Sequence, residues 1–458
     1  MTSQRESVHF IAIGGIGMSA LAKILLSMGY RVSGSDEKES DRLQELRSLG
    51  ATIYIGHAAE HVPADCKEVI YSSAINMEEN PEYLCAVARN IPITHRGSLL
   101  ARLVNAGQGF AVAGAHGKTT TSGMLSLILY ETGKNPNIVI GGTLPQIKSN
   151  AQKGDSDIWA IEADESDGSF LELHPYLTVV TNIEEEHMEH YKTRSNLDHA
   201  FAEFCDKSQH VILCLDSKMV RETAQMLEKP YATYGLEHLA VDLTARNLRY
   251  SGRGSDAEVY YRGEKVADLH LNIPGRHNIV NALGAMYAAF LAGIDFSASA
   301  EVLEHFTGMG RRFEVIYEDD NIMVVDDYAH HPTEVKATIE AGRNCCPKRL
   351  VAVFQPHRYS RVLDHYVEFG NSFGDADIII ISEIYSAWEE PIQGVTSQKI
   401  VDELEKKGLH PIYMKSNDVL LEYLKSNVEK GDLVLMMGAG DIWKTTKKFG
   451  SYLKGEKS

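Results

Sequence analysis

The residues with the most specific chemistry in this chain form a glycine-rich loop, residues 114–120, that ends in Gly-Lys-Thr-Thr. The loop follows an apolar run, residues 109–112, and precedes a helix-forming segment, residues 122–131. A strand that turns through glycines into a helix presents backbone N–H groups and the positive end of the helix dipole to a phosphate. In such a loop Lys118 would reach the terminal phosphates and the Thr119 hydroxyl would hold Mg²⁺. The pattern predicts a nucleotide triphosphate site; an ordinary turn between a strand and a helix is the alternative.

Two further groups suited to a metal follow predicted strands of the same region. Glu165 lies in a run of acids after the strand at 158–162, and a carboxylate there would complete the oxygen shell of Mg²⁺. His187 follows the strand at 177–182 and three glutamates, where it could bind a second Mg²⁺. The alternatives are a helix cap for Glu165 and a surface histidine beside acids for His187.

A second glycine motif lies near the start of the chain. Gly15-x-Gly17-x-x-Ala20 follows the predicted strand at 8–13, and Asp36 comes about twenty residues later. That spacing fits a dinucleotide fingerprint, in which the acid contacts a ribose. Alone it is a weak signal for NAD, and it indicates only that a nucleotide diphosphate could rest on this helix N-terminus.

Polar residues also begin a predicted helix near residue 277. The amides of Asn278 and Asn281 match the donor and acceptor pattern of an adenine edge, although asparagine at such a position is often a cap. Arg311 and Arg312 could clamp phosphates, or could form surface ion pairs.

Three cationic groups follow the predicted strand at 350–354. His357, Arg358 and Arg361 lie within five residues, and the planar fork of arginine matches a carboxylate. The cluster suits a small acid as substrate; a solvated charged face is the alternative.

Apolar β-branched runs alternate with helix-period segments along most of the chain, which predicts an α/β protein with parallel sheets. The stretch 247–273 alternates polar and apolar residues around two glycine turns, which indicates an antiparallel meander. At 458 residues the chain is too long to fold around a single hydrophobic core. We expect three domains, and the predicted boundaries give residues 1–101, 102–308 and 309–458.

Composition narrows the function. A formal net charge of −18 argues against nonspecific nucleic-acid binding. Six cysteines without a Cys-x-x-Cys pair indicate reduced thiols and a cytoplasmic protein. No apolar run has the length of a membrane span, and the polar start of the chain does not resemble a signal peptide, so no membrane insertion is expected.

The motifs together resemble the ATP-dependent Mur ligases, which build the peptidoglycan stem peptide. The resemblance runs from Val8 to about Lys444. It is carried by motifs in the family's order: Gly14–Ser19 with Ser33–Asp36, Gly114–Thr120, Glu162–Asp167, Thr181–His187, Pro274–Ala282, Gly310–Phe313, Asp326–Pro332 and Gln355–Arg358.

The resemblance implies a Rossmann-like UDP-binding domain, a P-loop ATPase-like central domain and a Rossmann-like C-terminal domain. For ATP it implies contacts from Gly114, Ala115, His116, Gly117, Lys118, Thr119, Thr120, Asn278, Asn281, Arg312 and Asp327, the last on the ribose. For the UDP-sugar it implies Gly15, Ile16, Gly17, Met18, Ser19, Asp36, His57 and Ser73. For the amino acid it implies His330, His357, Arg358 and Arg361. For Mg²⁺ it implies Thr119, Glu165 and His187, and for catalysis Lys118, His187, His330 and Arg312.

The implied reaction is the ATP-dependent ligation of L-alanine to the lactyl carboxylate of UDP-N-acetylmuramate through an acyl phosphate, in a bacterial cytoplasm. Its cofactor is Mg²⁺, and the implied oligomeric state is a monomer or weak homodimer. The alternative is a recycling ligase that attaches a preformed tripeptide to the same sugar nucleotide. Two departures from the family are Ala115, where threonine is usual, and the lack of a clear match for a carbamoylated lysine, since Lys192 and Lys207 are the nearest lysines.

Overall fold

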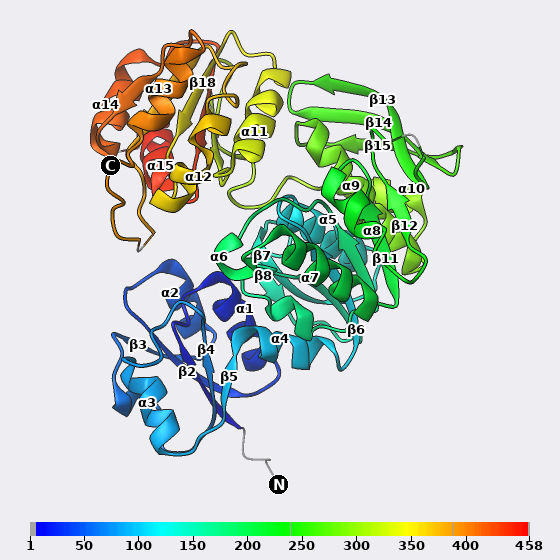
Figure 1. Ribbon diagram of the computed structural model, residues 1–458, viewed down its shortest axis with the longest axis vertical. Helices are drawn as coiled ribbons and strands as arrows, with labels where there is room; N and C mark the ends of the chain where they lie inside the picture. Colours follow the sequence, from blue (N-terminus) through cyan, green and yellow to red (C-terminus); the bar gives the residue numbers. More distant parts are fainter. Residues whose placement is uncertain (1–5, 239, 388, 457–458) are drawn as a thin grey trace. The chain divides into compact units, whose positions relative to one another are not determined.

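The computed structural model of the protein describes residues 6–238, 240–387 and 389–456. These residues form an α/β fold with three sheets in succession along the chain, which confirms the predicted class. In Figure 1 the first sheet is blue, the second cyan to green, and the third yellow to red. Within these ranges, no helix combines the length and apolar character needed to cross a bilayer.

The first sheet is parallel, with strand order β3-β2-β1-β4-β5. All five residues of β1 are buried, as expected for a central strand covered on both faces. The elements are β1 (Ser7–Ile11), α1 (Ile16–Ser27), β2 (Arg31–Asp36), α2 (Asp41–Ser48), β3 (Thr52–Ile55), β4 (Cys66–Tyr71), α3 (Pro81–Ala88), β5 (Ile93–His95) and α4 (Arg96–Val104).

The second sheet has strand order β15-β14-β13-β12-β11-β10-β6-β9-β7-β8. Its central pairs are parallel, and β7 and β8 are antiparallel. Its strands are β6 (Gln108–Ala113), β7 (Asn137–Leu144), β8 (Ser149–Gln152), β9 (Ile158–Glu162), β10 (Leu177–Val180), β11 (His210–Cys214), β12 (Ala232–Tyr234), β13 (Leu243–Ser251), β14 (Gly254–Tyr261) and β15 (Glu264–Leu271). Its helices are α5 (Lys118–Glu131), α6 (Met188–Tyr191), α7 (Arg194–Lys207), α8 (Lys218–Ala224), α9 (Arg276–Leu291) and α10 (Phe296–Leu303). The predicted meander corresponds to β13–β15.

The third sheet has strand order β16-β17-β21-β18-β19-β20, in which only β16 runs antiparallel to its neighbour. Its strands are β16 (Glu314–Glu318), β17 (Met323–Asp327), β18 (Arg349–Phe354), β19 (Ile378–Ser382), β20 (Ile412–Met414) and β21 (Asp432–Met437). Its helices are α11 (Pro332–Asn344), α12 (Tyr359–Phe369), α13 (Gln398–Lys406), α14 (Asn417–Asn427) and α15 (Ile442–Leu453).

The chain divides into two compact units. The first holds the first sheet and most of the second, and the second holds the third sheet and parts of β13, β14 and β15. The division passes through the β13–β15 meander and through α9, so that Asn281 belongs to the first unit and Asn278 to the second. Each unit is described by itself below.

Within the first unit, polar contacts join the first two sheets. Helix α1 packs against β7 and β8. The buried Lys23 of α1 donates hydrogen bonds to Ser149 Oγ, at 3.2 Å, and to Asn150 Oδ1, at 3.1 Å. In return, Asn150 Nδ2 donates to the carbonyl oxygen of Ile16, at 3.0 Å. The glycine loop before α1 is therefore fixed relative to the second sheet.

Candidate active site

The phosphate loop lies between β6 and α5, as the sequence predicts, and the helix begins at Lys118 itself. Gly114 and Gly117 adopt φ angles of +130° and +79°, which favour glycine. The two residues that follow β10 bind the backbone of the loop. The His116 N–H donates to Asn182 Oδ1 at 2.8 Å, and the His116 carbonyl accepts from Thr181 Oγ1 at 2.6 Å. The N–H groups of the first turn of α5 are thus held in place at an anion-binding helix N-terminus.

Lys118 lies at the centre of this site. Its ammonium contacts Glu165 Oε1 at 3.0 Å and also donates to the carbonyl oxygens of Gly114 and Ala115. Burial lowers the pKa of Lys118, but the carboxylates led by Glu165 outweigh burial, and the net pKa is raised. The lysine is therefore a permanent cation at the loop.

The carboxylate nearest the Thr119 hydroxyl belongs to Glu162, a residue that the sequence did not single out. Thr119 Oγ1 donates to Glu162 Oε2 at 2.9 Å, and the Gly141 N–H donates to the same oxygen at 2.9 Å. Glu162 ends β9, which pairs with β6 in parallel register. Glu165 Oε2 is buried and has no hydrogen-bond partner among the described residues. Hydroxyl and carboxylate oxygens from Thr119, Glu162 and Glu165 are the donors that Mg²⁺ prefers.

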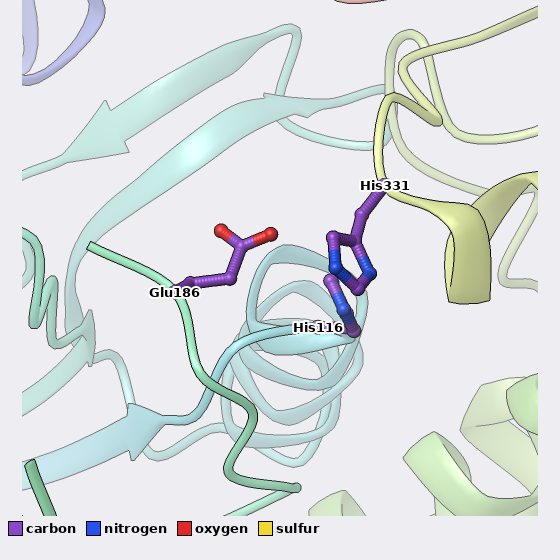
Figure 2. A group of neighbouring side chains, drawn as sticks. All are labelled: His116, Glu186 and His331. Atoms are coloured by element: carbon purple, nitrogen blue, oxygen red, sulfur yellow. The ribbon is translucent and has the colours of Figure 1, made fainter. Parts of the chain in front are cut away.

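Two histidines border this acidic region. His187 caps α6 at a φ of +57°, and its Nε2 lies 3.9 Å from Glu165 Oε1 and 3.7 Å from Glu186 Oε2. His116 Nε2 lies 3.3 Å from Glu184 Oε2. Figure 2 shows His116 and Glu186, which offer ligand atoms within 4.8 Å of each other. The figure also draws His331, which belongs to the second unit.

The predicted UDP-sugar residues lie at or after the carboxyl ends of β1, β2, β3 and β4 in the first sheet. Asp36 Oδ2 accepts a hydrogen bond from the Gly14 N–H at 2.8 Å, so this carboxylate supports the glycine turn. The side chains of Met18 and Ser19 are buried, and the Ser19 hydroxyl donates to the Ile16 carbonyl at 3.0 Å. The Ser19 N–H donates to the Gly15 carbonyl at 2.8 Å, inside the first turn of α1, and the role of both residues in binding the UDP-sugar stays a prediction. Gly15 and Gly17 lie at the start of α1.

A buried carboxylate supports His57. Glu82 is fully buried, accepts from the Ser35 hydroxyl and lies 3.4 Å from His57 Nδ1. His9 and His61 lie 3.4 Å and 3.0 Å from the same carboxylate. Burial raises the pKa of Glu82, but hydrogen bonds led by His9 and Ser35 outweigh it and bring the pKa to about 2. Glu82 is therefore a permanent anion beneath His57.

The two asparagines of α9 are both buried. In the first unit, Asn281 Oδ1 accepts from the Thr121 hydroxyl of α5 at 3.3 Å. In the second unit, Asn278 Nδ2 donates to the Pro274 carbonyl at 2.7 Å, which ties the first turn of α9 to the residues before the helix. Their adenine role stays a prediction.

In the second unit, the predicted phosphate and ribose residues are held by neighbours. Arg312 NH1 donates to Glu334 Oε1 at 3.2 Å. The buried Asp327 accepts from the Phe313 and Ala329 N–H groups at 2.8 Å and 2.7 Å. Burial raises the pKa of this carboxyl. In this structure both oxygens of Asp327 fix the backbone around Arg312, and its ribose contact stays a prediction.

The predicted amino-acid residues form a cluster at the carboxyl ends of β17 and β18. The rings of His330 and His357 lie 5.8 Å apart, and Tyr385 stacks on His357 at 5.8 Å. Arg358 adopts a φ of +70° at the N-terminus of α12, and its N–H donates to the Tyr385 carbonyl at 2.8 Å. Burial, followed by His330 and the arginines led by Arg361, lowers the pKa of His357 to about 3. The cluster therefore combines a neutral imidazole with two arginines, and arginine suits a carboxylate ligand.

The fold and the phosphate loop place the chain among α/β enzymes that bind a nucleotide through its phosphates. Its residues 7–108, 112–289 and 311–440 match, in order, the Mur ligase family catalytic domain, the Mur ligase middle domain and the Mur ligase glutamate ligase domain. The chain belongs to the Mur ligase family.

Individual relatives extend over the same length. A UDP-N-acetylmuramate–L-alanine ligase from Pelotomaculum thermopropionicum is 45% identical over 444 residues, which cover 96% of each chain. One from Geotalea uraniireducens is 40% identical over 460 residues, which cover 100% of each chain. The crystal structure of a UDP-N-acetylmuramate–alanine ligase from Thermotoga maritima matches with a TM-score of 0.85 and 29% identity, over 98% of this chain and 100% of that one. A murein peptide ligase from Psychrobacter arcticus, with a TM-score of 0.72 over 99% of this chain and 100% of that one, is 22% identical and shares the fold.

Proposed function

We propose that this protein joins L-alanine to the lactyl carboxylate of UDP-N-acetylmuramate at the expense of ATP, the first step in building the peptidoglycan stem peptide. The observation that carries the proposal is the agreement of relatives 40–45% identical over nearly the whole chain, which bear the name of that activity. The phosphate loop around Lys118 and the arginine cluster at Arg358 are the proposed sites for ATP and for L-alanine, two of the three substrates.

The reaction begins when the lactyl carboxylate attacks the γ-phosphorus of ATP, which gives an acyl phosphate and ADP. Lys118 and the loop N–H groups stabilise the charge on the transferring phosphoryl group. Arg312 is proposed as a further phosphate contact. The alanine amine then attacks the acyl carbon, and the tetrahedral intermediate collapses to the amide and inorganic phosphate.

The metal ligands proposed here are Thr119, Glu162 and Glu165, with His187 beside a second ion. The Thr119 hydroxyl donates a hydrogen bond to Glu162. Glu165 forms an ion pair with Lys118 through Oε1, and its buried Oε2 has no hydrogen-bond partner among the described residues. Mg²⁺, when bound, neutralises phosphate charge and orients the γ-phosphoryl group. Glu162 therefore joins the set as a residue that the structure, and not the sequence pattern, supports.

In the amino-acid pocket, Arg358 and Arg361 hold the alanine carboxylate, and His330 is the proposed base. The Nδ1 of His330 lies 2.9 Å from the Tyr328 carbonyl. When Nδ1 donates to that carbonyl, Nε2 carries the lone pair that can accept a proton from the alanine ammonium. His357 is neutral near pH 7, because its pKa is about 3.

The alternative function, a recycling ligase that adds a tripeptide in place of alanine, has less support than the alanine-adding function. The murein peptide ligase from Psychrobacter arcticus is 22% identical, which carries the fold alone. The relatives above 40% identity carry the alanine-adding name. We further propose a cytoplasmic protein, in keeping with reduced cysteines, and a monomer or weak homodimer.

The test is phosphate release from ATP and Mg²⁺ in the presence of UDP-N-acetylmuramate, with L-alanine, with the tripeptide L-alanyl-γ-D-glutamyl-diamino acid, or with no amine. We expect release that requires L-alanine and a product heavier by one alanyl unit. Release that requires the tripeptide would move the protein to the recycling branch. No release with either amine would refute the ligase proposal.

A further inference from the structure

Arg96, the first residue of α4, links the two glycine motifs of the first unit. Its NH2 donates to Asp164 Oδ2 at 3.0 Å and to Asp167 Oδ2 at 3.1 Å. Its NH1 lies 3.7 Å from the position that a β-carbon on Gly17, in the first turn of α1, would take. The side chain is 22% exposed, and one guanidinium bonds to the acidic loop and comes close to the predicted sugar-nucleotide site at Gly17.

A second contact runs along the same path. Ser73, a predicted sugar-nucleotide residue at the end of β4, donates its hydroxyl to Asp167 Oδ2 at 2.9 Å. His95 Nε2 lies 2.8 Å from the same hydroxyl. Asp167 is therefore shared between Arg96 and Ser73, and both come from the part of the chain that carries the first sheet.

The acidic loop, residues 163–168, reaches the phosphate loop at its other side. Glu165 contacts the Lys118 ammonium at 3.0 Å. The loop therefore lies between Lys118, from the ATP side, and Arg96, from the sugar-nucleotide side.

We propose that Arg96 is a positioning residue that ties the sugar-nucleotide loop at Gly17 to the acidic loop, and so fixes the lactyl carboxylate relative to the γ-phosphate of ATP. The inference rests on the proposed function. Its physical basis is that attack requires reacting atoms about 3–3.5 Å apart, and a displacement of about 1 Å costs roughly 100-fold in rate. A guanidinium is suited to the task because its NH2 bonds to Asp164 and Asp167 of the acidic loop while its NH1 extends toward Gly17.

The experiment compares Arg96→Ala and Arg96→Lys with Arg102→Ala. Arg102 is a matched control, since it lies on the same helix and forms a bidentate ion pair, with Glu68 at 2.8 Å, away from the acidic loop. We expect Arg96→Ala to lower kcat at least about tenfold and to raise the KM for UDP-N-acetylmuramate, with the KM for ATP within about twofold. Arg96→Lys should recover part of kcat, because an ammonium can still bind one carboxylate, and Arg102→Ala should match the wild type.

A double-mutant cycle with Asp167→Asn separates positioning from a local ion pair. We expect the losses of Arg96→Ala and Asp167→Asn to be less than additive in the double variant, because both remove the ion pair between Arg96 and Asp167, although Asp167→Asn also alters the contact with Ser73. Additive losses, or wild-type kcat and KM in a folded Arg96→Ala, would overturn the inference. If Arg96→Ala does not fold, Arg96→Lys and Asp167→Asn give the same readout. Wild-type protein without alanine-dependent phosphate release would refute the proposed function itself, which is a different outcome.

Discussion

Two glycines at opposite ends of α5 allow the energetic effect of a side-chain contact in the phosphate loop to be separated from the effect of backbone strain. Gly117 starts the helix at a φ of +79°, and Gly133 follows its end at +77°. A β-carbon added at Gly133 would meet nothing within 4 Å, whereas one added at Gly117 would lie 2.5 Å from Asn281 Oδ1. The substitutions Gly117→Ala and Gly133→Ala therefore share the strain and differ in the contact.

An alanine in the left-handed region costs about 1–2 kcal/mol, and this is the whole loss expected for Gly133→Ala. Gly117→Ala must also move Asn281, which breaks its hydrogen bond from Thr121, at 3.3 Å, and costs about 1 kcal/mol more. The expected losses in the free energy of unfolding are thus about 1–2 kcal/mol and about 2–3 kcal/mol. Because Gly117 belongs to the phosphate loop and Asn281 is the predicted adenine contact, Gly117→Ala should raise the KM for ATP and Gly133→Ala should not.

Urea denaturation and steady-state phosphate release at varied ATP measure the two effects. Arg102→Ala, which leaves α5 untouched, is a control for the assays. Equal losses of stability in the two alanine variants, together with an unchanged KM for ATP in Gly117→Ala, would show that the Asn281 contact has no energetic weight and would refute the reasoning.

Three other predictions concern Lys118, Arg358 and Glu82. Lys118→Ala should abolish phosphate release while circular dichroism stays native, because the loop backbone is held by β10; retained turnover would contradict its phosphate role. Arg358→Ala should raise the KM for L-alanine at least about tenfold and the KM for ATP less than about twofold, and equal effects would mark the arginine as structural. The Glu82 carboxylate, with a pKa of about 2 against the ordinary 4.5, stabilises the fold above about pH 4.5 and loses about 3 kcal/mol as the pH falls toward 2. Urea denaturation between pH 5 and 2 should therefore show a flatter pH dependence for Glu82→Gln than for the wild type, and parallel curves would contradict the shift.

The parts of the site that the sequence predicted are those built from adjacent residues. A strand, a glycine turn and a helix follow one another at Lys118, so the local pattern determines where its ammonium lies. The same holds for Arg358 and Arg361, which begin the helix directly after β18. The fold class was predictable for a similar reason, since alternating strands and helices leave few other arrangements.

The residues that the sequence missed depend on pairing between distant segments. Glu162 meets Thr119 because β9 pairs with β6, a pairing that the local sequence around Thr119 does not contain. Glu82 and Arg96 act through partners 47 and 68–71 residues away. The motif at Met18 and Ser19 likewise does not indicate that both side chains are buried, and their role in binding the UDP-sugar stays a prediction.

The buried Lys23 has a consequence for anyone who exchanges parts between relatives of this protein. The predicted boundary at 101/102 falls inside α4, and Lys23 reaches across to Ser149 and Asn150. A chimera that replaces only residues 1–101 would cut a helix and would place a buried ammonium against unmatched side chains. A graft that includes the whole of α4 and also Ser149 and Asn150 of β8 keeps this contact. The unit suited to recombination is therefore defined by the contact between α1 and β8, and not by the bounds of the first sheet.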